Sequence, residues 1–245
     1  MLEGLYSAAA GMAAQQRRID GVANDLANTS TTGYKHVRVG FRDLLYSQQG
    51  DAAGETVLAG AGSAAEFIGR GQAQGPLLST EQPLDVAIQG PGWFQVRRAD
   101  GSTALTRDGS FRLDTEGRLT TKDGLLLQPP LQVPRGTIAE QLAIAPDGTV
   151  RADGKPIGRL QLVTVPAPDG LLPTGGNCFE VTAASGAVQD APAGTTLRQG
   201  MLEGSNVDVG DAMVDMIDAQ RSFQLASKAI QMQDQMLEIA NQVKR

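Results

Sequence analysis

The chain has 245 residues, of which 41% are hydrophobic and 20% charged, and its formal net charge is −6 at pH 7. This composition can build a core and excludes wholesale disorder, and the acidic balance argues against nucleic acid as a partner. Because Cys178 is the only cysteine and His36 the only histidine, an internal disulfide and His- or Cys-rich metal sites are excluded, and we expect no cofactor.

The first element predicted is a helix over residues 2–28. Leu5, Met12, Ile19 and Leu26 recur every seven residues, which is the spacing of a coiled-coil seam. A hydroxyl-rich stretch ending at Gly33 stops the helix. The start of the chain lacks the basic-then-apolar pattern of a Sec signal, and no apolar run approaches the roughly 18 residues of a membrane span. We therefore expect a protein that is not membrane-inserted.

Two amides lie close to the end of this helix, Asn24 and Asn28. Side-chain amides at a helix end can bond the free backbone carbonyls there or the backbone of a neighbouring molecule. Residues 1–46, the helix and the loop that follows it, are expected to form one part of the chain.

The composition then changes, and residues 47–83 are rich in Gly and Ala. This composition indicates a connector with little regular structure of its own. One segment of it, residues 60–65, fits the dinucleotide pattern G-x-G-x-x-A. No solid strand precedes the segment and glycines break any helix after it, so nucleotide binding is disfavoured.

Residues 84–200 alternate between short apolar runs and tight turns, which predicts an antiparallel β domain. Six Asp-Gly pairs punctuate this region, beginning at residues 100, 108, 123, 147, 153 and 169. Asp-Gly favours the tight hairpin turn in which both central residues have positive φ. Turns explain these carboxylates better than calcium binding or acid–base chemistry, since no EF-hand spacing occurs.

The last part, residues 201–245, contains the strongest pattern of all. Between Val209 and Val243 a second heptad seam carries Met216, Phe223, Ile230 and Leu237, with alanines three positions after its large residues. Asp208 is expected to cap this long helix at its N-terminus.

Both chain ends thus carry helices of one kind, and the simplest use is to pack them together. The predicted fold is α+β: the N- and C-terminal helices pair as a discontinuous coiled-coil domain, and the antiparallel β domain is inserted between them. Two such helices bury little surface alone, so contacts with further copies are their natural completion.

Four sequence blocks resemble the signatures of the bacterial flagellar rod and hook protein family. Residues 23–35 resemble A-N-N-L-A-N-x-x-T-x-G-[FY]-K, with Asp25 where a second Asn is common. Residues 84–96 are similar to D-V-A-I-x-G-x-G-F-F-x-V, and residues 106–111 match T-R-D-G-S-F. The segment 203–209 and the helix after it resemble the C-terminal signature. The four blocks occur in the family order and cover nearly the whole chain.

The resemblance implies a structural subunit of the distal rod of the flagellar basal body, with a proximal rod subunit as the alternative. The implied polymer is a helical tube of many copies, in contact with other rod and hook proteins, that transmits torque to the hook. It also implies an extracytoplasmic location reached through the flagellar export apparatus, which agrees with the missing Sec signal.

We expect the two seams, together with the amides, to be the assembly interface. Its residues are Leu5, Met12, Ile19, Asn24, Leu26, Asn28, Met216, Phe223, Ile230 and Leu237. The simpler interpretation is that these side chains form an intramolecular core, and one stripe can serve both purposes. The rival class is an enzyme or ligand-binding β domain using His36 as a base or Cys178 as a nucleophile; a surface histidine and a core cysteine explain these residues better.

Overall fold

The structure is a computed structural model that describes residues 2–45, 47–50, 56–134 and 137–243. The chain forms two compact units. The helical unit contains Met1–Ala27, Val37–Ile68 and Asp208–Arg245, and the β unit contains Asn28–His36 and Gly69–Val207. Both ends of the chain lie in one unit, and the fold class is α+β as predicted.

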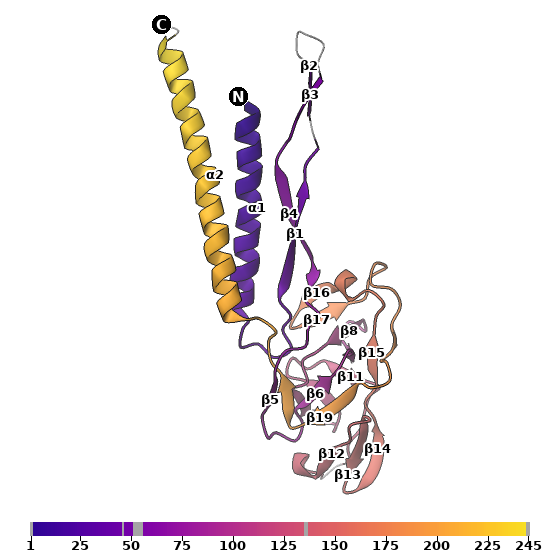
Figure 1. Cartoon of the computed structure of the whole chain (residues 1–245). Coiled ribbons are helices and arrows are strands. Elements are labelled where there is room, and N and C mark those ends of the chain that lie inside the picture. The colour runs from indigo at the N-terminus through magenta and orange to yellow at the C-terminus, as the bar shows by residue number, and fades with distance from the viewer. Residues whose placement is uncertain (1, 46, 51–55, 135–136, 244–245) are drawn as a thin grey trace. The chain divides into compact units, whose positions relative to one another are not determined.

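Two helices from opposite ends of the chain dominate the helical unit. Helix α1 (Leu2–Ala27) and helix α2 (Val209–Val243) lie side by side and antiparallel (Figure 1). The predicted bounds are correct to within one residue. Asp208 caps α2 as expected, since its Oδ1 accepts hydrogen bonds from the backbone N–H groups of Gly210 at 2.8 Å and Asp211 at 3.1 Å.

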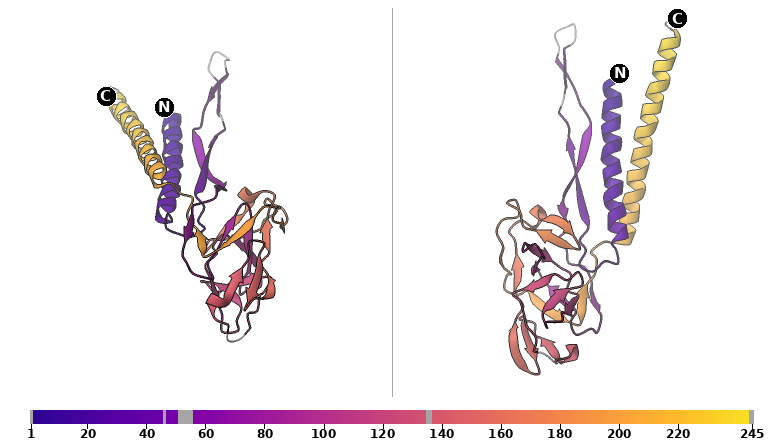
Figure 2. Two further views of the ribbon diagram at one scale, coloured as in Figure 1. Left: turned by 60° about the horizontal axis from the view of Figure 1, so that its bottom comes forward. Right: turned by 180° about the vertical axis from the view of Figure 1, so that it is seen from behind.

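Strands accompany the two helices. Strand β1 (Val37–Asp43) pairs with β4 (Ser63–Arg70), and β2 (Ser47–Gly50) pairs with β3 (Thr56–Ala59). The β1–β4 ribbon runs beside α1 in every view (Figures 1 and 2), and Arg17 of α1 donates to the backbone carbonyl of Ala65. The prediction of little regular structure for residues 47–83 is therefore wrong. Small residues here serve close packing: Gly62 has a φ of +95°, and a Cβ on it would lie 3.0 Å from the backbone of Ser7 in α1.

The helical unit has a thin core. Among its described residues, every buried apolar side chain is an alanine: Ala14, Ala65, Ala212 and Ala219. Each alanine removes far less apolar surface from water than a leucine or phenylalanine would. The helix pair therefore gains little stability from its own core.

The β unit is built from many short antiparallel strands. Its largest sheet has the order β16-β17-β8-β7-β11-β10-β9, with β15 also pairing with β7 and with β18. The strands of this sheet are β7 (Trp93–Arg97), β8 (Thr103–Thr106), β9 (Phe111–Leu113), β10 (Leu119–Thr121), β11 (Leu126–Gln128), β15 (Leu162–Thr164), β16 (Leu172–Gly175), β17 (Cys178–Glu180) and β18 (Gln189–Asp190). They confirm the β domain predicted from the short apolar runs.

Smaller sheets complete the unit. One contains β12 (Leu142–Ile144), β13 (Thr149–Ala152) and β14 (Lys155–Arg159). The other two pair β6 (Val86–Gln89) with β19 (Thr196–Gln199) and β5 (Leu77–Ser79) with β20 (Met201–Glu203). The segment that leads into α2 is thus tied into the β unit by strand pairing.

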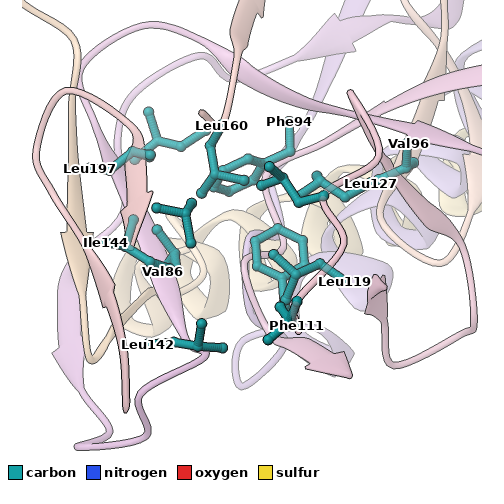
Figure 3. Packing of buried hydrophobic residues seen from close by; sticks show 14 of the residues in the cluster. Val86, Phe94, Val96, Phe111, Leu119, Leu127, Leu142, Ile144, Leu160 and Leu197 are labelled. Atoms are coloured by element: carbon teal, nitrogen blue, oxygen red, sulfur yellow. The ribbon is translucent and has the colours of Figure 1, made fainter. Parts of the chain in front are cut away.

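The β unit has a full core, in contrast to the helical unit. Figure 3 shows its main cluster, in which side chains such as Val86, Phe94, Leu127 and Leu197 pack together. The Phe94 and Phe111 rings meet edge to face, with centroids 4.9 Å apart. A core of large side chains from several sheets makes this the more stable unit by itself.

Four of the six Asp-Gly pairs form tight turns, and not all of these are of the predicted kind. Only Asp153-Gly154 has positive φ at both residues, 50° and 78°, and it joins β13 to β14 as a two-residue hairpin. At residues 101, 124 and 148 only the glycine is left-handed. There the turn is longer, and its hydrogen bond ends on the glycine N–H, as in a type I turn followed by a left-handed residue. Asp108-Gly109 and Asp169-Gly170 do not form hairpins.

Candidate assembly surface

The large residues of both predicted seams lie half-buried on the helix pair. This holds for Leu5, Met12, Ile19 and Leu26 on α1 and for Met216, Phe223, Ile230 and Leu237 on α2. Ala212 and Ala219, the small members of the α2 seam, are buried. Each seam thus lies on one face of its helix, and the packing of α1 against α2 covers part of both seams. Their contact with other copies stays a prediction.

Two contacts fix the register of α1 against α2. Arg18 Nη2 lies 2.7 Å from Asp215 Oδ1, and a Cβ on Gly4 would meet Gln233 Nε2 at 2.7 Å. The start of α1 is therefore opposite residue 233 or so. Roughly ten residues at the C-terminal end of α2 extend beyond the start of α1, which is a length of about 15 Å at 1.5 Å per residue.

A second apolar line on α2 is exposed, and the sequence analysis missed it. We call it the outer stripe and define it as Leu225, Ala229, Met232, Met236 and Ile239. Its four large side chains are 67%, 58%, 57% and 60% exposed. The spacing alternates between four and three residues, which is the coiled-coil repeat. The signal was present in the sequence, since Leu225, Met232 and Ile239 are themselves seven residues apart.

The signature loop after α1 has separate roles for its polar residues. Asn24 is exposed, and Asn28 Oδ1 accepts a hydrogen bond from Thr31 Oγ1 at 3.1 Å. Asp25 is buried, and its Oδ1 accepts from the backbone N–H of Val37 at 2.9 Å, where β1 begins. A carboxylate acceptor is well suited to this buried amide, which gives a physical reason for aspartate at this position.

Gly33 is required by the packing of this loop. Its φ is +68°, and a Cβ there would lie 2.8 Å from the backbone of residues 107 and 108. Its N–H donates to the carbonyl of Glu203 at 2.7 Å. The loop therefore contacts two of the other signature blocks directly.

A buried ion cluster lies at this meeting point. Glu203 is 1% exposed and binds Lys35 Nζ through Oε1 at 2.6 Å and Arg107 Nη1 through Oε2 at 3.0 Å. Lys35 also donates to the carbonyl of Ala73 at 2.7 Å. Burial lowers the pKa of Lys35 and of Arg107 below their ordinary values, and Glu203 offsets this effect only in part. The cluster joins the three signature blocks that the sequence analysis treated separately.

The two candidates for chemistry, His36 and Cys178, make packing or hydrogen-bond contacts within the β unit. The backbone N–H of His36 donates to Asn206 Oδ1 at 2.7 Å, and its ring lies against Gly71. Cys178 is buried, and burial raises the pKa of its thiol, which lowers the fraction of reactive thiolate. Within residues 2–45, 47–50, 56–134 and 137–243, no three His, Cys, Asp or Glu side chains are grouped so as to hold a metal ion. None of the described helices combines the length and apolar character that crossing a membrane requires.

A helix pair made from both chain ends, with a separate β unit inserted between them, defines a two-unit protein of α+β class. Comparison with known proteins agrees. Residues 5–35 match the family described as flagella basal body rod protein. Residues 87–152 match the flagellar hook protein FlgE/F/G D1 domain. Residues 198–243 match the C-terminal region of the flagellar basal body rod FlgEFG proteins.

Similar proteins extend these matches over the whole chain. The "Flagellar basal-body rod protein FlgG" of Borreliella burgdorferi is 38% identical, with 100% of both chains covered, and the protein of the same name in Bacillus subtilis is also 38% identical over the full length of both. "Flagellar basal-body rod protein FlgF" of Escherichia coli is 33% identical over 90% of each chain. The chain belongs to the flagellar basal-body rod protein family.

Proposed function

We propose that this chain is a structural subunit of the distal rod of the bacterial flagellum, where many copies polymerise into a helical tube that transmits torque to the hook. The observation that carries the proposal is the agreement between full-length similarity to rod proteins and a helix pair that exposes an apolar stripe. The FlgG relatives cited are more similar than the FlgF relative, which favours the distal over the proximal rod.

The outer stripe is the proposed contact between copies. Completing the burial of its four large side chains would contribute roughly 4–8 kcal/mol per copy, taking about 1–2 kcal/mol for the exposed part of each. The exposed side of α1 carries Ala9, Ala13, Ala23 and Ala27 at spacings of four, ten and four residues, with the exposed polar pair Gln16 and Asp20 between the two alanine pairs. Small side chains let a neighbouring helix approach closely. Large side chains on one copy and alanines on the next make a heterologous contact, the kind from which an open helical tube is built.

The predicted seam residues have a supporting part in this proposal. They hold α1 against α2, so that the outer stripe and the alanine line are presented by one stable pair. The predicted contacts of Asn24 with a neighbouring backbone belong to the same surface, since that side chain is exposed.

The remaining parts of the proposal concern location and partners. A rod subunit lies outside the cytoplasm in the basal body, touches other rod and hook proteins, and reaches its place through the flagellar export apparatus.

The test is a deletion of the gene, complemented with a tagged copy. We expect the deletion strain to be non-motile, without hook or filament, and the tag to be found in the rod of purified basal bodies. A motile deletion strain, or a tag absent from basal bodies, would contradict the proposal.

A further inference from the structure

The exposed side of α1 is one line of residues with coiled-coil spacing. From residue 4 to residue 27, the exposed side chains at positions 6, 9, 13, 16, 20, 23 and 27 are separated by alternating steps of three and four. The only other exposed residues in this range, Arg17 and Asn24, are direct neighbours of the line. We call it the α1 line and define it as Tyr6, Ala9, Ala13, Gln16, Asp20, Ala23 and Ala27. Because the outer stripe has the same repeat, the two surfaces match in spacing.

The two surfaces also match in the size of their side chains. When they are aligned antiparallel with Tyr6 opposite Ile239, their steps coincide, and alanines of each line face larger residues of the other. The opposed pairs are Tyr6 with Ile239, Ala9 with Met236, Ala13 with Met232, Gln16 with Ala229 and Asp20 with Leu225. A shift of one heptad in either direction places Ala229 opposite another alanine and leaves a gap there, so packing favours this register.

Charge complements the same register. Asp20 is the one acidic member of the α1 line, and its Oδ1 accepts a hydrogen bond from Gln16 Nε2 at 2.9 Å. Lys228 is exposed and is the one basic residue between residues 222 and 243. Neither Asp20 nor Lys228 belongs to an ion pair within the described part of the chain. No acid lies three or four residues from Lys228 to pair with it along the helix, so both charges are available to a neighbour.

The aligned helices bring these two charges together. In this register Lys228 is level with residue 17 of the opposite α1, less than one helical turn from Asp20. Side chains on a helix lean toward its N-terminus, so in an antiparallel pair Lys228 and Asp20 lean toward each other.

We propose that α2 of one copy packs against α1 of the next in this register, with an ion pair between Lys228 of one copy and Asp20 of the other. The proposal rests on the proposed polymer: the helices are antiparallel within a copy, and rotation about a tube axis parallel to them keeps this direction between copies. An aspartate in an apolar line costs stability wherever it is left unpaired, which is how one polar residue specifies one alignment of a coiled coil.

This ion pair does not form within a single copy. Arg18 pairs with Asp215 at 2.7 Å, so Asp20 is level with about residue 213 of its own α2. Lys228 is about 15 residues further along that helix, a distance of roughly 20 Å. Rescue of one charge reversal by the other therefore reports a contact between copies.

The test reverses the two charges in a strain that lacks the native gene, complemented with Asp20→Lys, Lys228→Asp, both changes together, or wild type. We expect each single variant to give at least tenfold fewer hooks per cell, because like charges then meet in every contact. The double variant should restore at least half of the wild-type number. Both positions are exposed, so circular dichroism and melting of the free chains should match wild type. A double variant no better than the single variants, or single variants with normal hooks, would overturn the proposal.

Arg221 supplies the matched control, because it is exposed and lies one heptad before Lys228. A register shifted by one heptad would pair Asp20 with Arg221. We therefore expect Asp20→Lys combined with Arg221→Asp to stay defective, and rescue by this combination would overturn the register. A wild-type gene that restores no hook refutes the proposed function, whereas a functional wild type without rescue by the double variant refutes the ion pair alone.

A cysteine pair tests the register without a change of charge. Ala13→Cys with Met232→Cys is oxidised in purified basal bodies and compared with Ala13→Cys with Leu225→Cys, the pair that a shift of one heptad would oppose. Cys178 is buried and does not compete. We expect a ladder of multimers on a denaturing gel from the first pair and monomer from the second. A ladder from the second pair alone, or from neither, would overturn the register. If the cysteine variants do not assemble, the charge reversals decide.

Discussion

The change Ile239→Glu tests the outer stripe most cleanly. Ile239 is 60% exposed and lies in the part of α2 beyond the start of α1, so the free chain loses little when it is replaced. Glutamate is at least as good a helix former as isoleucine, and an exposed substitution changes stability by no more than about 0.5 kcal/mol. No lysine or arginine lies three or four residues away on either side to pair with the new carboxylate.

In the polymer the same change is severe. The contact loses about 1–2 kcal/mol of apolar burial, and the buried carboxylate costs several kcal/mol more. At about 1.4 kcal/mol per factor of ten, a total near 5 kcal/mol weakens each contact by more than a thousandfold. The penalty recurs in every subunit, so we expect no rod and no motility.

The assay compares Ile239→Glu with Gln231→Glu in a strain that lacks the native gene. Gln231 is exposed and lies on the polar side of α2, about 80° around the helix from residue 239 at 3.6 residues per turn. The control therefore adds the same charge outside the stripe and should swim normally. Circular dichroism and thermal melting of both purified chains should match wild type. Normal swimming by the Ile239→Glu strain would show that the outer stripe is not an assembly contact.

Four further predictions follow from the two units and the ion cluster. Phe223→Asp puts a carboxylate on the half-buried seam, so it should separate α1 from α2 and abolish motility without changing the melting of the β unit. A strain with the control change Asp218→Ser, on the exposed surface, should swim normally. A motile Phe223→Asp strain would refute the role of the seam. Glu203→Gln leaves two buried cations unpaired and should destabilise the β unit by about 3–5 kcal/mol in urea unfolding followed by tryptophan fluorescence, and a loss under 1 kcal/mol would contradict this account. Burial lowers the pKa of Lys35 in the folded chain below its ordinary value of 10.5, so at a pH between the two values the unfolded chain binds more protons, and the stability of the β unit should rise with pH as it approaches 10.5. This rise should be absent in Lys35→Met, and an equal rise in both chains would exclude Lys35 as its source. Backbone amides of α1 and α2 in the free chain should exchange with deuterium before those of the β unit, because the buried apolar side chains among the described residues of the helical unit are all alanines. The reverse order would contradict the comparison of the two cores.

The sequence was sufficient for the features that local patterns determine. The heptads and the acid at position 208 placed both helices, and short apolar runs between turns predicted an antiparallel β domain over residues 84–200, because periodicity and capping act over a few residues. Glycine and alanine misled the analysis over residues 47–83, where small side chains permit close strand and helix packing rather than irregular structure.

The parts that could not be predicted depend on long-range contacts. Lys35, Arg107 and Glu203 are far apart in sequence, and charged residues are assigned to the surface unless a partner is known. Each of them belongs to a family signature, yet only the structure shows that they meet. The outer stripe could not be predicted for another reason: the first seam by itself accounts for the helix, so the pattern did not require a second apolar line on α2.

Electron cryomicroscopy of purified basal bodies, at a resolution that separates helices and side chains, tests the central claim most directly. The account predicts this chain in the rod as a helical polymer, with Leu225, Met232, Met236 and Ile239 of α2 buried against a helix of a neighbouring copy. A rod in which these four side chains face solvent, or a rod without this chain, would contradict it.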